Sequence, residues 1–355
     1  MTTDAVGGVW TYALDLAGEL ATSGVQTTLA IMGPSAKADQ LRAAKAVDGL
    51  ALIETGLPLD WTAASPEELK VAADEIAALA RGQRAEVIHL NSPTLAAYVR
   101  FHAPVVGACH SCVGTWWGAV RQGDLPQDFR WRTEALARAY ARCDALVAPS
   151  RAFASATAAT YGVKSVAAVH NGRRPIPTDQ PKSDSVIFTA GRLWDAGKNV
   201  AMLDAAAAHL DAPVYAAGPL ESPTGGRVTL PNLRLLGRLG EQDVADWMAH
   251  AQIFVSTALY EPFGLSVLEA AQAGCALVLS DIPTFRELWD DAALFVAPND
   301  VEALTATLGA LLNRPARAAM LGRAARERAK RYTVEAMGRG VLDLYRSLMP
   351  AEAAA

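Results

Sequence analysis

The sequence predicts an α/β protein with two Rossmann-like domains, each built on a parallel sheet. Short apolar runs that suit buried strands alternate with segments of helical spacing along the whole 355-residue chain. A proline-rich stretch near the middle divides these runs into two sets. The length and the 51% hydrophobic content are sufficient for two domains that each have a core of their own.

Eight apolar runs carry the strand prediction, four before the proline-rich stretch and four after it. They span residues 27–32, 87–90, 105–108, 145–148, 186–190, 213–217, 253–256 and 276–279. Because helical segments separate most of these runs, we expect βαβ connections, parallel pairing and helices on both faces of each sheet.

The domain boundaries follow from the break in this alternation. We expect an N-terminal domain over 1–174, a linker over 175–184 that contains three prolines, and a C-terminal domain over 185–332. The helical stretch 333–349 either completes the second domain or crosses back to the first, and residues 350–355 form a frayed tail. Two such domains would face each other across a cleft at the carboxyl ends of their strands.

The start of the chain lacks a recognisable first strand. Gly7 and Gly8 open the first helix, and only Met1, Thr2 and Thr3 precede Asp4. The first strand of a doubly wound sheet is central, and about five buried residues at roughly 1.5–3 kcal/mol each would match the net stability of a domain. We therefore expect this strand to be missing or truncated, with a natural reading frame that begins upstream.

Charge and cysteine content exclude several classes of protein. The net charge of −5, which the second half carries, argues against a general nucleic-acid-binding protein. No signal peptide and no apolar run of membrane-spanning length is present, so we expect a cytoplasmic protein. Cys109 and Cys112 form the only close cysteine pair, and no second pair of ligands at zinc spacing accompanies them. No zinc site is therefore expected at this pair.

The most informative stretch is residues 261–269, which read EPFGLSVLE. It follows the strand run 253–256 and leads into an apolar helix, so Glu261 lies at the carboxyl end of a strand, where α/β proteins bind ligands. Two explanations of Glu269 stay open, ligand binding and a helix capping box with Ser266. Glu261 has no such structural explanation, so we favour a functional role for it.

A second loop at the same sheet edge carries two cations. Residues 191–199 read GRLWDAGKN and follow the strand run 186–190, so Arg192 and Lys198 flank a flexible turn before a helix. Arginine binds a phosphate through two hydrogen bonds, lysine acts as a point charge, and helix amides add further donors. The loop is suited to hold a diphosphate, and a solvated basic loop is the alternative.

The first domain offers two weaker candidates. Gly7 and Gly8 place bare backbone amides at a helix start, which suits a phosphate or a sugar, although a tight turn has the same signature. His110 follows the strand run 105–108 at its carboxyl end, a position that favours function over a structural role.

Several catalytic schemes have no motif in this sequence. It contains no nucleophile elbow, zinc-protease helix, Walker lysine loop or dinucleotide fingerprint, and no Asp-x-Asp pair that would hold a divalent metal. A diphosphate leaving group would then be stabilised by arginine, lysine and helix dipoles.

Taken in order along the chain, these motifs resemble those of glycosyltransferase family 4, whose members are retaining enzymes with the two-domain GT-B fold. The resemblance spans nearly the whole chain, and its most specific part is the pair Glu261 and Glu269. Its other matches are Gly7-Gly8, Pro149-Ser150, His170-Asn171-Gly172 and Ala190-Gly191-Arg192 with Lys198. The absent first strand is the one clear departure.

The resemblance implies catalytic roles for four residues. Arg192 and Lys198 would hold the diphosphate of the donor, Glu261 would face the donor sugar, and His110 would contact that sugar from the first domain. Retention of configuration arises either through a covalent intermediate or through front-face attack, and the resemblance favours front-face attack.

The remaining matches would bind the donor. Glu269 would hydrogen-bond the ribose hydroxyls, and the pair Gly7-Gly8 would lie under the diphosphate and the acceptor. Backbone amides would contact sugar hydroxyls and phosphate from Phe263, Gly264 and Leu265.

The resemblance therefore implies a hexosyltransferase of carbohydrate biosynthesis that uses a UDP- or GDP-sugar without a cofactor or metal. Its acceptor would be a sugar, a lipid-linked molecule or a small molecule. Two alternatives are a nucleotide-sugar epimerase or phosphorylase of similar fold, and a catalytically silent nucleotide-sugar-binding subunit.

One segment of the first domain is rich in arginine and tryptophan. It could meet an anionic acceptor, give weak peripheral contact with the inner face of the plasma membrane, or form an ordinary solvated helix face. Its members are Trp116, Trp117, Arg121, Arg130, Trp131, Arg132, Arg138 and Arg142.

Overall fold

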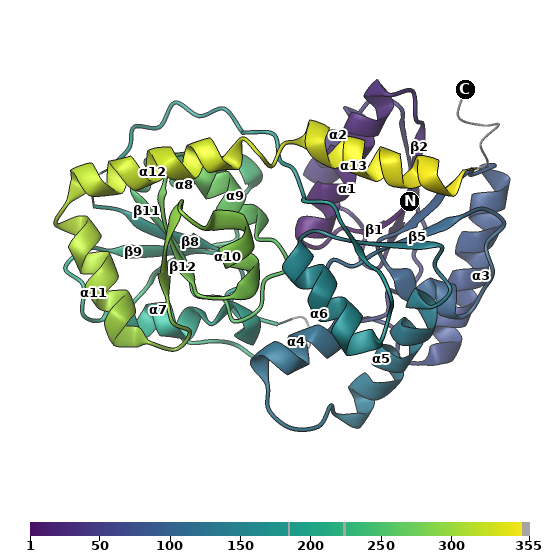
Figure 1. The fold of residues 1–355 in the computed structure, drawn as a ribbon, viewed down its shortest axis with the longest axis horizontal. Coiled ribbons are helices and arrows are strands. Elements are labelled where there is room, and N and C mark those ends of the chain that lie inside the picture. Colours follow the sequence, from purple (N-terminus) through teal and green to yellow (C-terminus); the bar gives the residue numbers. More distant parts are fainter. Residues whose placement is uncertain (184, 223–224, 350–355) are drawn as a thin grey trace. The chain divides into compact units, whose positions relative to one another are not determined.

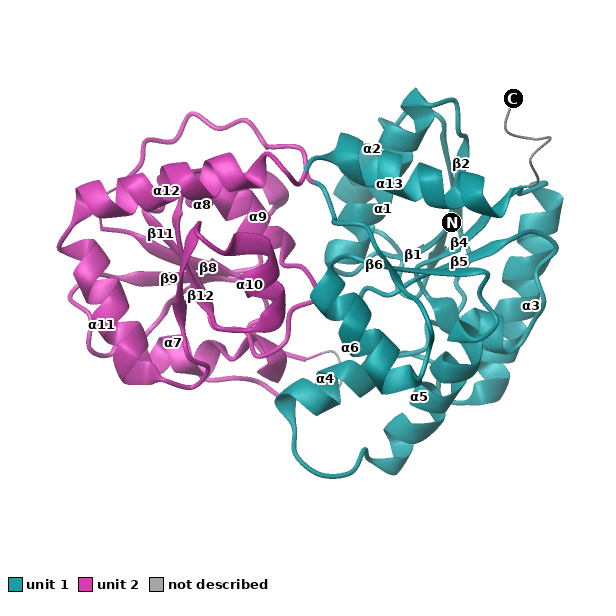
Figure 2. Cartoon of the chain, in the orientation of Figure 1, with its two compact units in different colours: residues 1–172, 333–355 teal, residues 173–332 magenta. Residues whose placement is uncertain are grey.

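The chain forms two compact units in the computed structural model, which describes residues 1–183, 185–222 and 225–349 (Figure 1). Unit 1 contains Met1–Gly172 together with the chain from Thr333 onward, and unit 2 contains Arg173–Tyr332 (Figure 2). Each unit is an α/β layered structure on parallel sheets, so the predicted fold class is confirmed. The tail predicted over 350–355 lies outside the described residues.

Unit 1 is built on parallel strands in two ladders, β1-β2-β3 and β4-β5-β6-β7. The strands are β1 (Thr2–Asp4), β2 (Thr27–Met32), β3 (Leu50–Glu54), β4 (Ile88–Leu90), β5 (Val105–Ala108), β6 (Ala145–Ala148) and β7 (Ala167–Ala168). Asn91, directly after β4, joins the two ladders, because its backbone N–H donates to Thr2 Oγ1 at 3.0 Å and its side-chain amide donates to Thr2 O at 2.8 Å.

The helices of unit 1 follow the strands in alternation. They are α1 (Gly8–Thr22), α2 (Ala38–Lys45), α3 (Pro66–Gly82), the 3₁₀ turn η1 (Pro93–Ala97), α4 (Val113–Val120), α5 (Gln127–Tyr140), α6 (Arg151–Tyr161) and α13 (Val334–Leu348).

The first strand, expected to be missing or truncated, is present as the three-residue β1. It pairs in parallel with β2, with Thr2 opposite Ala30 and Asp4 opposite Met32. Thr2 and Thr3 are buried. Because both are polar, the strand does not appear in a search for apolar runs. Threonine suits this place because its β-branched side chain favours a strand and its hydroxyl finds a partner, here Asn91 for Thr2.

The last helix, α13, belongs to unit 1 and packs on α1. Its apolar residues Val334, Met337 and Val341 share a buried cluster with Leu16 and Leu20. A stripe at this spacing is typical of a helix that buries one face.

A buried hydrogen bond also fixes α13 to the sheet, since Tyr345 Oη lies 2.8 Å from Nδ1 of His89 on β4. Burial is the main cause that lowers the pKa of His89 from its ordinary value of 6.5 to about 3. His89 is therefore neutral in the folded chain at neutral pH.

Acidification is expected to destabilise the chain through His89. Between its unfolded pKa of 6.5 and its folded pKa of about 3, the unfolded chain binds a proton that the folded chain does not. The stability present above pH 6.5 is thus lost as the pH falls, by about 2 kcal/mol between pH 7 and pH 5. Urea denaturation at both pH values should show this loss in the wild type and a smaller one in His89→Gln, and equal losses would contradict the assignment.

Unit 2 is built on one six-stranded parallel sheet of order β10-β9-β8-β11-β12-β13. The strands are β8 (Ile187–Ala190), β9 (Val214–Ala217), β10 (Arg234–Gly237), β11 (Ile253–Ser256), β12 (Ala276–Ser280) and β13 (Ala293–Val296). The chain leaves β8 toward one edge and returns to β11, from which it continues to the other edge. The order therefore reverses between β8 and β11, and ligands of such sheets bind at the carboxyl ends of the two strands at the reversal.

Helices cover both faces of this sheet. The elements are η2 (Ala196–Lys198), α7 (Val200–Ala207), α8 (Glu241–His250), α9 (Leu265–Gln272), α10 (Pro283–Trp289), α11 (Val301–Leu312) and α12 (Pro315–Ala329). Alternate residues of β11 enter different cores: Phe254 packs among residues of α8, α9 and α10, whereas Ile253 and Val255 pack among residues of α7 and α11. This alternation is expected of a central strand.

The segment that opens unit 2 has no helix or strand over residues 173–183, and residue 184 of the predicted linker lies outside the described residues. Thr178 donates a hydrogen bond to Asp246 of α8 at 2.8 Å. The Lys182 ammonium donates to the carbonyl oxygens of Ala251 and Ala273, just past the ends of α8 and α9, at 2.9 Å each. These positions suit a cation, because helix C-termini carry unsatisfied carbonyls and partial negative charge.

Candidate active site

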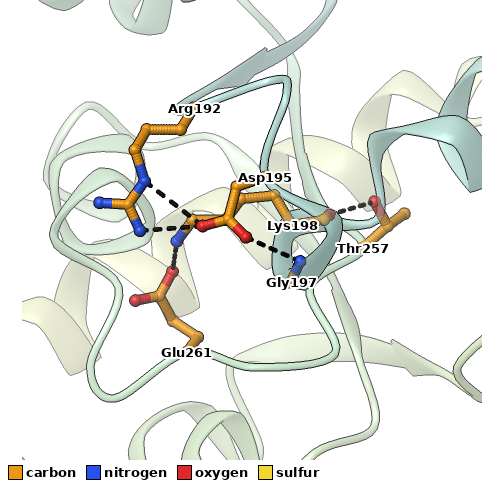
Figure 3. Close-up of polar contacts among 6 residues, drawn as sticks. All are labelled: Arg192, Asp195, Gly197, Lys198, Thr257 and Glu261. Atoms are coloured by element: carbon orange, nitrogen blue, oxygen red, sulfur yellow. Dashed lines mark hydrogen bonds and ion pairs between the residues drawn. The ribbon is translucent and has the colours of Figure 1, made fainter. Parts of the chain in front are cut away.

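Two loops meet at the reversal point of the unit 2 sheet, one after β8 and one after β11 (Figure 3). The buried Thr257 hydroxyl donates to Lys198 O at 3.2 Å and to Asn199 O at 2.9 Å. The backbone N–H groups of Leu259 and Tyr260 donate to Gly197 O at 2.9 and 3.2 Å. These bonds fix the backbones that carry Lys198 and Glu261 against each other.

Replacing Thr257 by Val is expected to loosen this junction. Valine has nearly the same shape but no hydroxyl, so the two carbonyl groups lose their shared donor. The free energy of unfolding in urea should fall by about 1–2 kcal/mol. Thr257→Ser keeps the donor and is the matched control, so an equal loss in both variants would mean that packing rather than the hydrogen bonds secures the loops.

The side chains of Lys198 and Glu261 form an ion pair where the two loops meet (Figure 3). Both are largely shielded from solvent, with exposed fractions of 22% for Lys198 and 12% for Glu261. A pair at this depth is screened less by salt than a surface pair. The geometry keeps one cation and one carboxylate side by side at the ligand-binding edge.

A second ion pair holds Arg192 beside them. Its Nη2 lies 2.9 Å from Asp195 Oδ2, and the other carboxylate oxygen of Asp195 accepts the N–H of Gly197 at 2.8 Å. Burial by itself raises the pKa of Asp195, but Arg192, the Gly197 N–H and Lys198 together hold it below its ordinary value. Asp195 therefore stays ionised and orients the guanidinium, which is 46% exposed and open to a ligand.

Helix α9 begins at Leu265, and Gly264 with φ of 91° is its N-cap residue. Ser266 thus lies inside the helix, and the capping box with Glu269 is wrong. A glycine occupies the cap because this left-handed backbone costs other residues about 1–2 kcal/mol. Phe263 is buried in the unit 2 core, with its ring at 90° to that of Tyr332.

Glu269 faces an arginine that the sequence did not single out. Its Oε1 accepts Arg173 Nε at 2.9 Å, and Arg173 also forms an ion pair with Glu241 at the start of α8. The side chain of Glu269 is 22% exposed. Glu269 is therefore held by Arg173 while part of its side chain stays exposed.

The unit 1 candidates lie at the carboxyl ends of β1 and β5. Gly7 is the N-cap residue of α1 with φ of 83°, and Gly8 is the first residue of that helix. His110 Nε2 lies 2.7 Å from Asn91 Oδ1. The centroids of the His110 and Tyr12 rings are 4.5 Å apart.

The hydrogen bonds of Asn91 define which ring nitrogen of His110 carries a proton. The amide nitrogen of Asn91 donates to Thr2 O, so its oxygen faces His110 and accepts from Nε2. Burial lowers the pKa of His110 to about 4, so the ring is neutral at neutral pH. Its Nδ1 therefore presents a lone pair as a hydrogen-bond acceptor.

The structure brings Arg192, Lys198, Glu261 and the start of α9 together in unit 2, and it places Gly7, Gly8 and His110 in unit 1. Sequence reasoning missed Asp195, Thr257 and Arg173. Asp195 had a usable signal, because an aspartate two residues before a glycine commonly accepts a backbone N–H in a turn. Arg173 had none, since its partners are distant in sequence.

Some arginines of the arginine-rich segment in unit 1 form hydrogen bonds within the unit. Arg132 donates to Asp60 O at 2.9 Å and to Ala63 O at 2.8 Å, and Arg130 donates to Leu125 O at 3.0 Å. Over residues 1–183, 185–222 and 225–349, no helix reaches the length and hydropathy that a membrane crossing requires. The same described parts contain no group of three or more His, Cys, Asp or Glu side chains that could hold a metal ion.

Comparison with known proteins agrees with this architecture. The model "Glycosyltransferase Family 4" matches residues 6–175, and the model "Glycosyl transferases group 1" matches residues 184–314. O-antigen chain mannosyltransferase B of Escherichia coli is 39% identical over 74 residues, which are 21% of this chain and 19% of that protein. The matched segments span 19% to 32% of the length of the curated relatives.

Solved structures match over nearly the whole chain. Sucrose-phosphate synthase from Thermosynechococcus elongatus has a TM-score of 0.77 at 19% identity and covers 100% of this chain and 96% of its own. HepE from Anabaena, solved in complex with UDP-glucose, has a TM-score of 0.73 at 16% identity and covers 98% of this chain and 100% of its own. The two family models together span both units, and the fold is that of these GT-B structures; the chain is a member of glycosyltransferase family 4.

Proposed function

We propose that the chain is a retaining hexosyltransferase that moves a hexosyl group from a nucleotide-diphosphate sugar to an acceptor hydroxyl without a bound metal. The observation that carries this proposal is the cluster of Arg192, Lys198 and Glu261 at the reversal point of the unit 2 sheet. Two cations and a carboxylate lie there on fixed loops beside a helix N-terminus, as departure of a diphosphate from a sugar requires.

The leaving group is stabilised by the two cations. When the bond between the anomeric carbon and the diphosphate breaks, negative charge grows on the phosphate oxygens. Arg192 donates two hydrogen bonds in a plane and Lys198 contributes a point charge, while the first-turn amides of α9 add donors. These groups neutralise the charge that a metal ion neutralises in other transferases, so activity should persist in EDTA.

The sugar becomes positively charged as the leaving group departs. Glu261 lies beside Lys198, so its carboxylate can stabilise the oxocarbenium-like carbon while the lysine follows the phosphate. Front-face attack, in which the departing phosphate takes the proton of the acceptor, needs no further base. In this proposal Nδ1 of the neutral His110 accepts a hydrogen bond from a hydroxyl of the donor sugar. The backbone amides of Gly7-Gly8 donate to the diphosphate and the acceptor.

Similarity to known proteins guides the choice of donors and acceptors to test. The Anabaena structure was solved with UDP-glucose, and the relatives include mannosyltransferases of O-antigen and of lipopolysaccharide core, so glucosyl and mannosyl donors on UDP or GDP are the first to test. The acceptor is a sugar, lipid-linked or small-molecule hydroxyl compound. A cytoplasmic enzyme with weak peripheral contact to the inner face of the plasma membrane fits such an acceptor.

A thermal-shift panel of UDP-, GDP- and ADP-sugars tests the proposal. A donor at a hundred times its dissociation constant adds about 2.7 kcal/mol to the stability, so the right base should stand out. The same samples are then examined for product after addition of acceptors. Isomerised donor without any acceptor would indicate an epimerase, and binding without turnover would indicate a silent binding subunit.

A further inference from the structure

Arg173, the first residue of unit 2, lies between two carboxylates that belong to different helices. Its Nε donates to Glu269 Oε1 on α9 at 2.9 Å, and its Nη2 pairs with Glu241 Oε1 on α8. The arginine side chain is only 8% exposed, whereas Glu241 is 61% exposed. A guanidinium so far removed from water costs free energy unless carboxylates compensate it, and here two do so.

The backbone of Arg173 is docked on the same helix. The Gln272 side chain donates from Nε2 to Arg173 O at 2.7 Å. Because Glu269 and Gln272 are three positions apart, they share one face of α9. That face therefore holds both the carbonyl group and the guanidinium of Arg173.

These contacts restrict the rotamers of the Glu269 side chain. A glutamate has three rotatable bonds, and an exposed one samples many rotamers. Here Oε1 is held by Arg173, while the side chain keeps its 22% exposure. An ionised carboxylate has about four acceptor sites, so a partly exposed glutamate that is held by an arginine can also accept hydroxyl donors of a ligand.

We propose that Arg173 is a positioning residue for recognition of the ribose hydroxyls of the donor nucleotide, acting through Glu269. This inference rests on the proposed function. Glu269 accepts the two hydroxyls, and Arg173 fixes the carboxylate in the orientation that receives both of them. The planar fork of arginine serves Glu241 and Glu269 at once, which a lysine point charge does not reproduce.

The test compares a nucleoside diphosphate with its 2′,3′-dideoxy counterpart, using whichever of UDP, GDP and ADP binds the wild type best. Calorimetry should show that the wild type prefers the ribose form by roughly 30-fold, since hydrogen bonds to a charged group are strong. Arg173→Ala should reduce this preference to about 3-fold, because affinity falls for the ribose form and much less for the dideoxy form. Arg173→Lys should be intermediate.

Arg326→Ala is the matched control. Arg326 also donates to α9, through Nε to Gln272 O at 2.9 Å, but its bond is to a backbone carbonyl group at the end of the helix. Its removal should leave the preference near 30-fold. In steady-state assays, Arg173→Ala should raise KM for the donor by a larger factor than it lowers kcat.

Other outcomes overturn the inference in distinguishable ways. Equal losses for both ligands in Arg173→Ala would assign the arginine a purely structural role. Failure of the wild type to bind any of the three nucleotides would overturn the proposed function itself. If Arg173→Ala does not fold, Glu241→Gln loosens the same guanidinium with little change of shape, and an unaltered 30-fold preference there and in Arg173→Lys would refute the positioning role.

Discussion

Replacing Glu261 by Gln is expected to lower kcat by about 100- to 1000-fold, the effect of removing one preorganised electrostatic group from an active site. Glutamine has the shape of glutamate but no charge, so it leaves the developing positive charge on the sugar without its nearest anion. Lys198→Ala should lower kcat/KM to a similar degree, because in the proposed mechanism the lysine is the cation beside the leaving group.

Folding should suffer far less than catalysis in both variants. The ion pair is partly buried, so breaking it should lower the free energy of unfolding by about 1–2 kcal/mol, somewhat more than for a surface pair. The exposed pair of Lys330 and Glu327 supplies matched controls, since Glu327→Gln and Lys330→Ala break a lysine–glutamate pair on the surface of α12. Glycosyl transfer at near-wild-type rates in both Glu261→Gln and Lys198→Ala would contradict the assignment of the site.

Replacing Gly218 by Ala is expected to be the most destabilising change near the site. Gly218 has φ of 141°, and a Cβ atom there would lie 1.8 Å from the carbonyl oxygen of Gly191, which directly precedes Arg192. Backbone bonds tie this place together, because Gly191 N donates to Ala217 O at 3.0 Å and Gly218 N donates to Gly237 O at 2.7 Å. The clash therefore has to push the arginine loop away from the sheet.

We expect Gly218→Ala to lose about 4 kcal/mol of stability or to fail to fold, with loss of donor binding in any folded fraction. Gly237→Ala separates the two causes. Gly237 also has positive φ, at 69°, but no atom lies within 4 Å of the Cβ position, so only about 1–2 kcal/mol of backbone strain is expected. Equal urea midpoints for the two variants would contradict the close approach of Gly218 to the carbonyl oxygen of Gly191.

The central strands were predictable because they are buried on both faces. The run predicted over 253–256 is β11, and the run predicted over 276–279 extends by one residue as β12. The strands β3, β7, β10 and β13 were missed; each lies at an edge of its strand order, and none is buried along its whole length. Edge and short strands depend on their neighbours more than on their own hydrophobicity, as β1 with its two threonines also shows.

The site was predictable where strand ends determine it. Loops that follow adjacent parallel strands must meet at one sheet edge, so Arg192, Lys198 and Glu261 could be placed near one another before the structure was known. The partners that orient them were less accessible. Thr257 acts through backbone carbonyls of another loop, and Arg173 reaches Glu269 across 96 positions of sequence. The predicted capping box is wrong because Gly264, two residues before Ser266, is the N-cap residue, so Ser266 lies inside the helix.

Calorimetric titration of UDP, GDP and ADP in the presence of EDTA tests the central claim most directly, with the wild type and the Arg192→Ala/Lys198→Ala double variant. One of the three nucleotides should bind the wild type without metal, and the double variant should bind it at least about 100-fold more weakly while unfolding at a similar urea concentration, because two charge-assisted contacts to the diphosphate are gone. Absence of binding by all three nucleotides, or equal affinity in the double variant, would contradict the account.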